Sequence, residues 1–204
     1  MPTLLHIDSS PRAASVSSKL AAAFVRRWQR RNPEGTVIHH NTTLEKIPFI
    51  DEAYIAAAYT PAASLTPEQK QTLAYSDQLV DELLAADVIV FGVPMWNLGI
   101  PASLKAWIDM VVRAGRTFAI TENGVGTLVP PGKKVYVISA RGGAYPAGTP
   151  AKAYDQQEPY LRSIFGFLGI AHIEFIYAEK QGLGGEAAAE GLAKAVTALA
   201  QLAA

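Results

Sequence analysis

The sequence predicts an α/β protein, with a mostly parallel sheet covered by helices on both faces. Two observations lead to this expectation. Short apolar runs alternate with segments of helical periodicity along the whole chain, and strand–helix alternation of this kind is typical of parallel sheets. The chain has 204 residues, 50% of them hydrophobic, which is enough for one compact core. No repeat or linker divides it, so we expect a single domain over residues 1–204.

Five apolar runs are the predicted strands, and the strongest of them is DVIVFGVP. In chain order they cover residues 3–8, 36–41, 87–94, 133–140 and 172–178. The predicted helices cover residues 17–31, 66–86, 101–112, 157–167 and 186–202. The second of these helices has the clearest start: Thr66 can cap it, Pro67 suits the first helical position, and Gln69 can complete a capping box.

Two segments do not fit the alternation. Residues 43–64 read as a short helix plus a loop, and residues 115–131 read as a long loop rich in glycine and proline. Long loops in compact domains are often functional, although a surface excursion would have the same composition.

Composition excludes several classes of protein. The net charge is zero, whereas a nucleic-acid-binding protein is expected to carry a basic surplus; the run RRWQRR fits a solvated helix face. No cysteine is present, which excludes thiol nucleophiles, disulfides and cysteine metal sites. No apolar stretch is long enough to span a bilayer and the start does not resemble a signal peptide, so we expect a cytoplasmic protein that binds neither membrane nor nucleic acid.

A serine-rich loop follows the first predicted strand and leads into the first helix. Ser9, Ser10, Ser15, Val16 and Ser17 lie there, and hydroxyls and free N–H groups at a helix N-terminus bind phosphate well. The glycine pattern of dinucleotide sites and the Walker lysine are both absent, so a terminal phosphate monoester fits better. Taken alone, the same serines could simply cap the helix.

Two further loops follow predicted strands at the same edge of the sheet, where ligands of open α/β sheets bind. The first supplies Met95, Trp96, Asn97 and Leu98, an apolar and aromatic edge with an amide that suits a flat heteroaromatic ring, although core packing would also explain the Met and Trp. The second supplies Ser139, Ala140, Arg141, Gly142 and Gly143, whose glycines allow a backbone to approach a ring. Together the loops fit flavin mononucleotide (FMN) on a flavodoxin-like three-layer sandwich, with five parallel strands in the order 2-1-3-4-5.

The motifs SSPR…SVSSKL, GVPMWNLGIPASLKAWIDMVVRAGRTF, TENGVGTLV and SARGGAY resemble the FMN-dependent NADH azoreductases, which also reduce quinones. The resemblance implies bound FMN, held by the residues of the three loops, with NADH or NADPH as the electron donor and a quinone or azo compound as the acceptor. It implies ping-pong kinetics, no metal and no catalytic side chain. It also implies a homodimer whose substrate pocket is completed by the partner subunit, with Phe118, Tyr145 and Tyr59 as candidate walls.

Two departures from the family pattern stand at the ring edge, where many members have tyrosine in place of Trp96 and some have phenylalanine in place of Leu98. The first loop is one residue shorter than in some relatives, which leaves open whether Ser9 or Ser10 meets the phosphate. The alternative function is a flavodoxin-type carrier of single electrons, whose surface is usually acidic, unlike this neutral chain.

Overall fold

The computed structural model describes residues 1–122 and 124–202. Residue 123, in the predicted loop 115–131, and residues 203–204, at the end of the predicted domain, lie outside the described residues. The strands are β1 Thr3–Asp8, β2 Thr36–Asn41, β3 Val88–Pro94, β4 Phe118–Thr121, β5 Gly124–Thr127, β6 Lys134–Ala140 and β7 His172–Ala178. The helices are α1 Val16–Arg31, α2 Glu52–Ala58, α3 Pro67–Ala85, α4 Ala102–Val111, α5 Gln157–Phe167 and α6 Gly185–Gln201, with short 3₁₀ turns at Ala62–Ser64 and Pro150–Tyr154.

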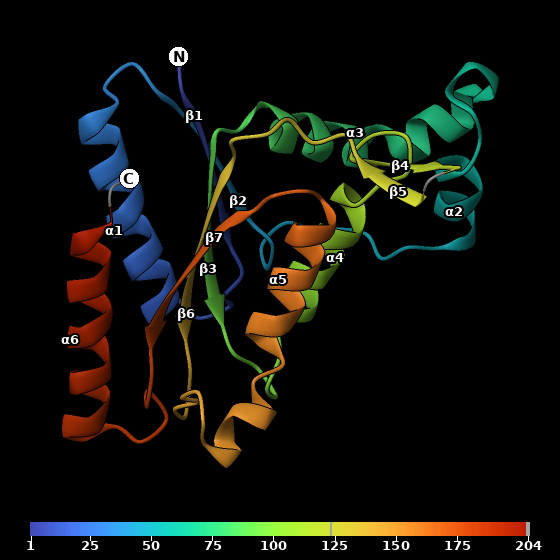
Figure 1. Cartoon of the computed structure of the whole chain (residues 1–204). Coiled ribbons are helices and arrows are strands. Elements are labelled where there is room, and N and C mark those ends of the chain that lie inside the picture. The colour runs from blue at the N-terminus through green and yellow to red at the C-terminus, as the bar shows by residue number, and fades with distance from the viewer. Residues whose placement is uncertain (123, 203–204) are drawn as a thin grey trace.

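Five strands form one parallel sheet in the order β2-β1-β3-β6-β7. The chain leaves β1 toward β2 and then returns to the other side of β1, so the winding direction reverses between β1 and β3. In open sheets this is the place where ligands bind, outside the carboxyl ends of the strands. These ends lie at the bottom of Figure 1.

The predicted sheet is matched in part, because the chain contains two strands that the sequence did not predict. Phe118–Thr121 and Gly124–Thr127 pair antiparallel as a separate hairpin within the segment predicted to be a loop. Each has only four residues, and the second contains two glycines, so neither shows the apolar alternation by which a strand is recognised. The last two strands of the sheet are therefore β6 and β7.

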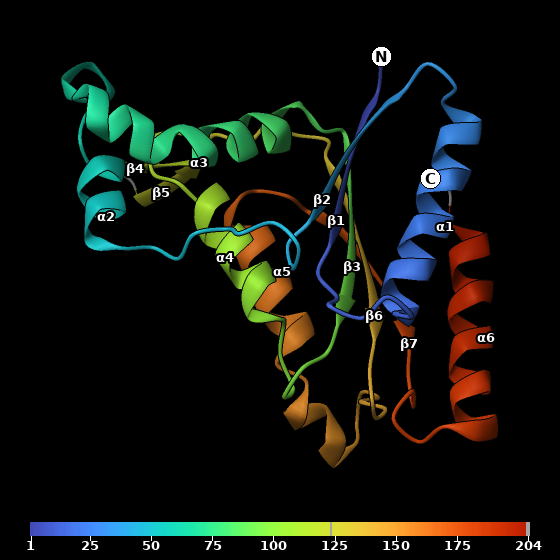
Figure 2. The same ribbon diagram turned by 180° about the vertical axis from the view of Figure 1, so that it is seen from behind.

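The sheet separates two apolar clusters. Helices α1 and α6 lie side by side on one face and pack on residues such as Leu4, Val90 and Ile138, while α3, α4 and α5 cover the other face through Leu5, Phe91 and their neighbours (Figures 1 and 2). Alternate strand residues point to opposite faces, which is why continuous apolar runs are needed in a sheet covered on both sides. Helix α2 and the β4–β5 hairpin lie beyond this sandwich, at the far end from α1 and α6.

The predicted start of α3 is confirmed. The Thr66 hydroxyl accepts a hydrogen bond from the Gln69 amide, the Gln69 side chain accepts one from the Thr66 amide, and Pro67 is the first helical residue. Among the described residues, no helix has both the length and the apolar character that crossing a membrane requires.

Candidate functional site

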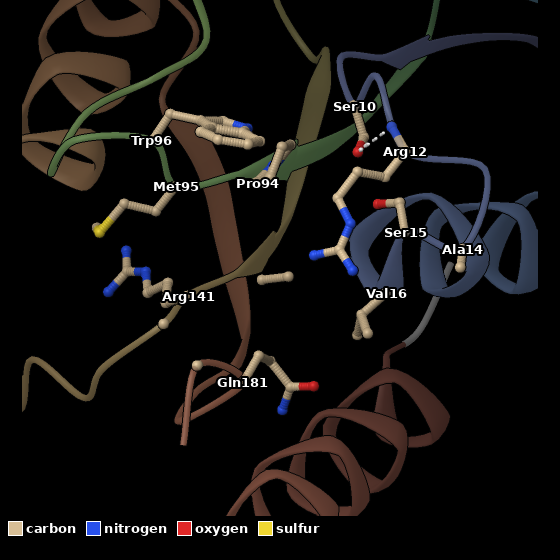
Figure 3. Close-up of a pocket in the computed structure, with 13 residues that line it drawn as sticks. Ser10, Arg12, Ala14, Ser15, Val16, Pro94, Met95, Trp96, Arg141 and Gln181 are labelled. Carbon is tan, nitrogen blue, oxygen red and sulfur yellow. Dashed lines mark hydrogen bonds between the residues drawn. The ribbon is translucent and has the colours of Figure 1, made fainter. Parts of the chain in front are cut away.

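A cavity of about 290 Å³ opens at the carboxyl ends of the strands, where the sheet reverses direction (Figure 3). The loops after β1, β3, β6 and β7 all reach it. Its lining residues are Ser10, Arg12, Ala14, Ser15, Val16, Pro94, Met95, Trp96, Ala140, Arg141, Gly142, Gln181 and Gly182. The structure thus brings together parts of all three loops that the sequence singled out.

The serine-rich loop ends at the N-terminus of α1. Ser15 is the N-cap: its hydroxyl accepts from the Ser18 amide at 3.2 Å, while the Ser18 hydroxyl donates to Asp8 at 2.8 Å. Asp8 ends β1, so the loop is tied back to its own strand. Because the first amides of a helix lack partners within it, this wall of the cavity offers N–H groups and the positive end of the helix dipole.

The sequence left open whether Ser9 or Ser10 meets the phosphate, and the two side chains lie in different surroundings. Ser9 is fully buried, and its hydroxyl donates to the Gly92 carbonyl of β3 at 3.0 Å. Ser10 lines the cavity, where its hydroxyl accepts from the Arg12 amide at 3.3 Å. Ser17 is also fully buried, with its hydroxyl 3.0 Å from that of Ser15. Ser10 and Ser15 are therefore the serines whose side chains border the cavity.

Arg12 was not among the predicted site residues. Its side chain runs past Ser15 into the middle of the cavity (Figure 3). The sequence does contain an indication of this role. A single cationic residue lies within a serine-rich loop at the start of a helix, and this pattern favours the binding of an anion.

The loop after β3 forms a tight turn. The amide and carbonyl of Trp96 bond to those of Gly99, and both central residues, Asn97 and Leu98, have positive φ values of 45° and 73°. Asparagine tolerates this conformation, whereas for leucine it is strained. Pro94, Met95 and Trp96 line the cavity, while Asn97 borders a shallower hollow on the other side of Trp96, and Leu98 is partly exposed.

The loop after β6 brings mainly small residues to the cavity. Ala140 and Gly142 line the cavity, and Gly143 follows them. Gly182, which follows β7, lies so close that a Cβ on it would stand 3.1 Å from the Gly142 carbonyl oxygen. The sequence alone does not indicate Gln181 and Gly182, because only the order of the sheet brings the end of β7 to this cavity.

The Arg141 side chain turns away from the serine-rich loop (Figure 3). It is buried, its guanidinium lies 3.8 Å from the centre of the Tyr177 ring, and Nη1 pairs with Asp155 at 3.2 Å. Burial alone would raise the pKa of Asp155, but the Glu158 amide, Lys152 and Arg141 outweigh it and hold that pKa below its ordinary value. Ser139 is fully buried as well, and its hydroxyl donates to Gln157.

The three candidate substrate walls do not meet in one chain. Tyr59 and Phe118 line a second cavity of about 350 Å³, between α2 and the C-terminal end of α4. Tyr145 instead folds back over Gly143, and its amide donates to Glu179 at 3.1 Å. The second cavity lies at the opposite end of α4 from the turn at Trp96.

The chemistry of the first cavity is specific. Arginine is the only charged residue type among its lining residues, at Arg12 and Arg141, and the wall opposite the helix N-terminus is apolar and aromatic. A dianion at one end and a flat ring at the other satisfy both walls.

Comparison with known proteins agrees with this geometry. A family model described as flavodoxin-like fold matches residues 2–203. An FMN-dependent NADH:quinone oxidoreductase from Nostoc sp. is 50% identical over 202 residues, with 98% of each chain covered. The chain belongs to the flavodoxin-like family of FMN-dependent NADH:quinone oxidoreductases.

Solved structures of azoreductases have the same fold as this chain. An azoreductase from Bacillus anthracis str. Sterne has a TM-score of 0.86 at 30% identity, covering 99% of this chain and 100% of that one. An FMN-dependent NADH-azoreductase from Bacillus anthracis str. Ames Ancestor, in complex with FMN, has a TM-score of 0.86 at 26% identity, covering 98% and 96%. The predicted family resemblance is confirmed.

Proposed function

We propose that the chain is an FMN-dependent oxidoreductase that takes electrons from NADH or NADPH and reduces quinones, and that also cleaves azo bonds. The observation that carries this proposal is the cavity itself, which joins a helix N-terminus and an arginine to an apolar, aromatic wall. The names of the relatives, FMN-dependent NADH:quinone oxidoreductase and azoreductase, agree with it.

The residues at the cavity fit the parts of FMN. Ser10, Arg12, Ser15 and the first amides of α1 would hold the phosphate, and of the two candidate serines we assign this role to Ser10 rather than Ser9. Met95 and Trp96 would border the ring. The amides of Val16 and Ser17, the first two residues of α1, belong to this phosphate end. The remaining predicted contacts are proposed as backbone contacts to the ring edge or supports behind it: Asn97, Leu98, Ser139, Ala140, Arg141, Gly142 and Gly143.

When bound, FMN supplies two-electron transfer between the nicotinamide and the acceptor. The protein's own work is to hold the ring, exclude water from one side of it and stack the substrate. The titratable residues among those that line the cavity are Arg12 and Arg141, and arginine does not exchange protons near neutral pH. Protons therefore come from solvent, and donor and acceptor use one position in turn, which gives ping-pong kinetics.

We also propose that residues 1–204 act as one domain in a homodimer, in the cytoplasm, where the reduced nicotinamides are found. The separation of the two cavities supports the dimer, since a second copy would bring its Tyr59 and Phe118 over the flavin. Tyr145, beside Gly143, would stand at the rim of the same site.

The first test is cofactor binding by the purified full-length chain. Removal of the Arg12 guanidinium in Arg12→Ala costs a charge-assisted hydrogen bond to phosphate, so we expect FMN to bind about 10- to 100-fold more weakly. Riboflavin, which lacks the phosphate, should bind the two proteins equally. Fluorescence titration of the apoprotein measures both constants, and Lys19→Ala, which removes an exposed cation from the first turn of α1, is the matched control.

Turnover is tested with the reconstituted protein, NADH and a panel of quinones and azo compounds. Parallel lines in double-reciprocal plots support the proposed order of substrates. A chain that binds no FMN, or one that binds FMN but accepts electrons only from a protein partner, contradicts the proposed function.

A further inference from the structure

Gln157, the first residue of α5, is fully buried although its side chain is an amide. The buried face of this helix consists of Gln157, Leu161 and Phe165, which are spaced four residues apart. Such spacing is the apolar stripe of an amphipathic helix. The stripe is interrupted at one position only, at the end of the helix that lies nearest the cofactor cavity, where an apolar side chain would pack without needing hydrogen-bond partners.

The side-chain oxygen and the NH₂ group of Gln157 each bond to one of two neighbouring strands. The Ser139 hydroxyl of β6 donates to Oε1 of Gln157, and Nε2 of Gln157 donates to the Pro94 carbonyl of β3 at 3.3 Å. A carbonyl can only accept, so the NH₂ group must face Pro94 and the oxygen must face Ser139. The side chain therefore bridges the carboxyl ends of β3 and β6, from which both ring-edge loops depart.

The residues before Gln157 bind the same two loops. The Gln156 amide donates to the Leu98 carbonyl at 3.1 Å, and Asp155 pairs with Arg141. Asp155 also accepts from the amides of Gln157 and Glu158, at 3.1 Å each. The start of α5 is thus bonded to the turn after β3 and to the loop after β6. External support of this kind is what a strained turn such as Asn97–Leu98 requires.

Ser139 has one hydroxyl proton, and it is donated to Gln157. Its hydroxyl can accept a further bond, and Arg141 Nε lies 3.4 Å away, but it has no proton left for a ligand.

We infer that Gln157 is a positioning residue, whose amide sets the spacing of the Met95–Leu98 and Ala140–Gly143 loops and so the fit of the flavin ring between them. The inference rests on the proposed function. It assigns to Gln157 no contact with FMN or substrate.

The test compares Gln157→Leu and Gln157→Glu with the wild type. Leucine continues the apolar stripe but makes neither bond, and we expect FMN binding at least 10-fold weaker, with an altered visible circular dichroism spectrum of the bound flavin. Gln71→Leu, the same change on an exposed face of α3, should leave both unchanged.

Gln157→Glu gives a pH-dependent change in FMN affinity, which a general loss of protein stability would not produce. When protonated, its carboxyl can accept from Ser139 and donate to Pro94, as the amide does; when ionised, it can only accept. The ratio of variant to wild-type FMN dissociation constants should therefore be near one at pH 5.5 and exceed 10 at pH 8. Asp155 and Arg141 are the same in both proteins, and titration of the FMN phosphate affects both, so the ratio isolates position 157.

The outcomes separate the two proposals. If the wild type binds no FMN, the proposed function fails. If it binds FMN and both variants bind it within twofold of the wild type at all pH values, the inference about Gln157 is wrong. If the leucine variant does not fold, the pH dependence of the glutamate variant decides alone.

Discussion

His6 lies in the middle of β1, and its ring is buried. It stands 4.6 Å from the ring of His39, and its Nε2 has no hydrogen-bond partner among the residues that the structure describes. Burial, and then the neighbouring His39, lower the pKa of His6 from 6.5 to about 4. His6 is not among the residues that line the first cavity, so its ring serves packing within the sheet.

The lowered pKa of His6 predicts a loss of stability in acid. The folded state favours the neutral ring, so this contribution is complete above pH 6.5 and is lost as the pH falls from 6.5 to about 4. The loss is on the order of 3 kcal/mol. In urea unfolding at pH 7 and pH 4.5, the stability of His6→Leu should fall less between the two pH values than that of the wild type; an equal fall would contradict the prediction.

His40 changes the stability of the fold with pH in the opposite direction, so its effect has to be measured separately from that of His6. Burial would lower the pKa of His40, but hydrogen bonds to Glu45 and Glu82 outweigh it and raise the pKa above 6.5. Its stabilising contribution is therefore complete below pH 6.5 and is lost as the pH rises through the folded-state value. A parallel series on His40→Gln measures this second effect, which appears on the alkaline side.

Helix α3 shows how local sequence determines an element boundary. Its capping box satisfies two amide groups that would otherwise lack partners at the helix start. Thr66→Ala removes the cap at a cost of about 1 kcal/mol, which for a chain of this size lowers Tm by about 2–4 °C. Thermal unfolding of the apoprotein measures the shift.

The control for the cap is a second threonine on the same helix. Thr72 is exposed in the helix interior, and its hydroxyl bonds back to the Glu68 carbonyl. Alanine is the better helix former at such a position, so Thr72→Ala should leave Tm unchanged or slightly higher. A loss at Thr72 equal to that at Thr66 would mean that the cap is not the cause.

Elements with a strong periodic signal could be predicted from the sequence. The boundaries of β3, β6, α4 and α6 lie within one residue of those expected. The β4–β5 hairpin could not be predicted, because each strand has only four residues and β5 contains two glycines, which leaves too short a pattern to recognise.

Where one loop held several informative residues, the sequence pointed to residues that the structure places at the cavity, as with Met95 and Trp96. Three other residues near the site could not be predicted from the sequence. Gln181 and Gly182 reach it only through the order of the sheet, and Gln157 only through the packing of α5 on the sheet.

At the scale of the whole molecule, the end formed by α2 and the β4–β5 hairpin exposes several large apolar side chains. Large apolar side chains are exposed on the segment before α2, on α2, on the hairpin and just after it: Phe49, Ile50, Ile55, Tyr59, Ile120, Val125 and Leu128. Exposed apolar side chains gathered at one end of a molecule commonly mark a protein–protein contact. We therefore place the proposed dimer contact on this surface.

A charge within this surface should disrupt the dimer. Ile120 is 72% exposed, so Ile120→Asp costs a single chain little but buries a carboxylate in the proposed contact. Light scattering after size exclusion should give twice the chain mass of 21.8 kDa for the wild type and the single mass for the variant. Val196→Asp, on the exposed face of α6, should remain dimeric, and a monomeric wild type that is fully active would refute the dimer.

Helix α4 has ten residues and is about 15 Å long, and the two cavities lie toward its opposite ends. If a two-fold assembly joins the first cavity of one chain to the second cavity of the other, each dimer holds two composite sites. A chain damaged at Arg12 and a chain damaged at Tyr59 would then complement each other. In the mixed dimer both lesions would fall in one site, and the other would consist of intact residues from both chains.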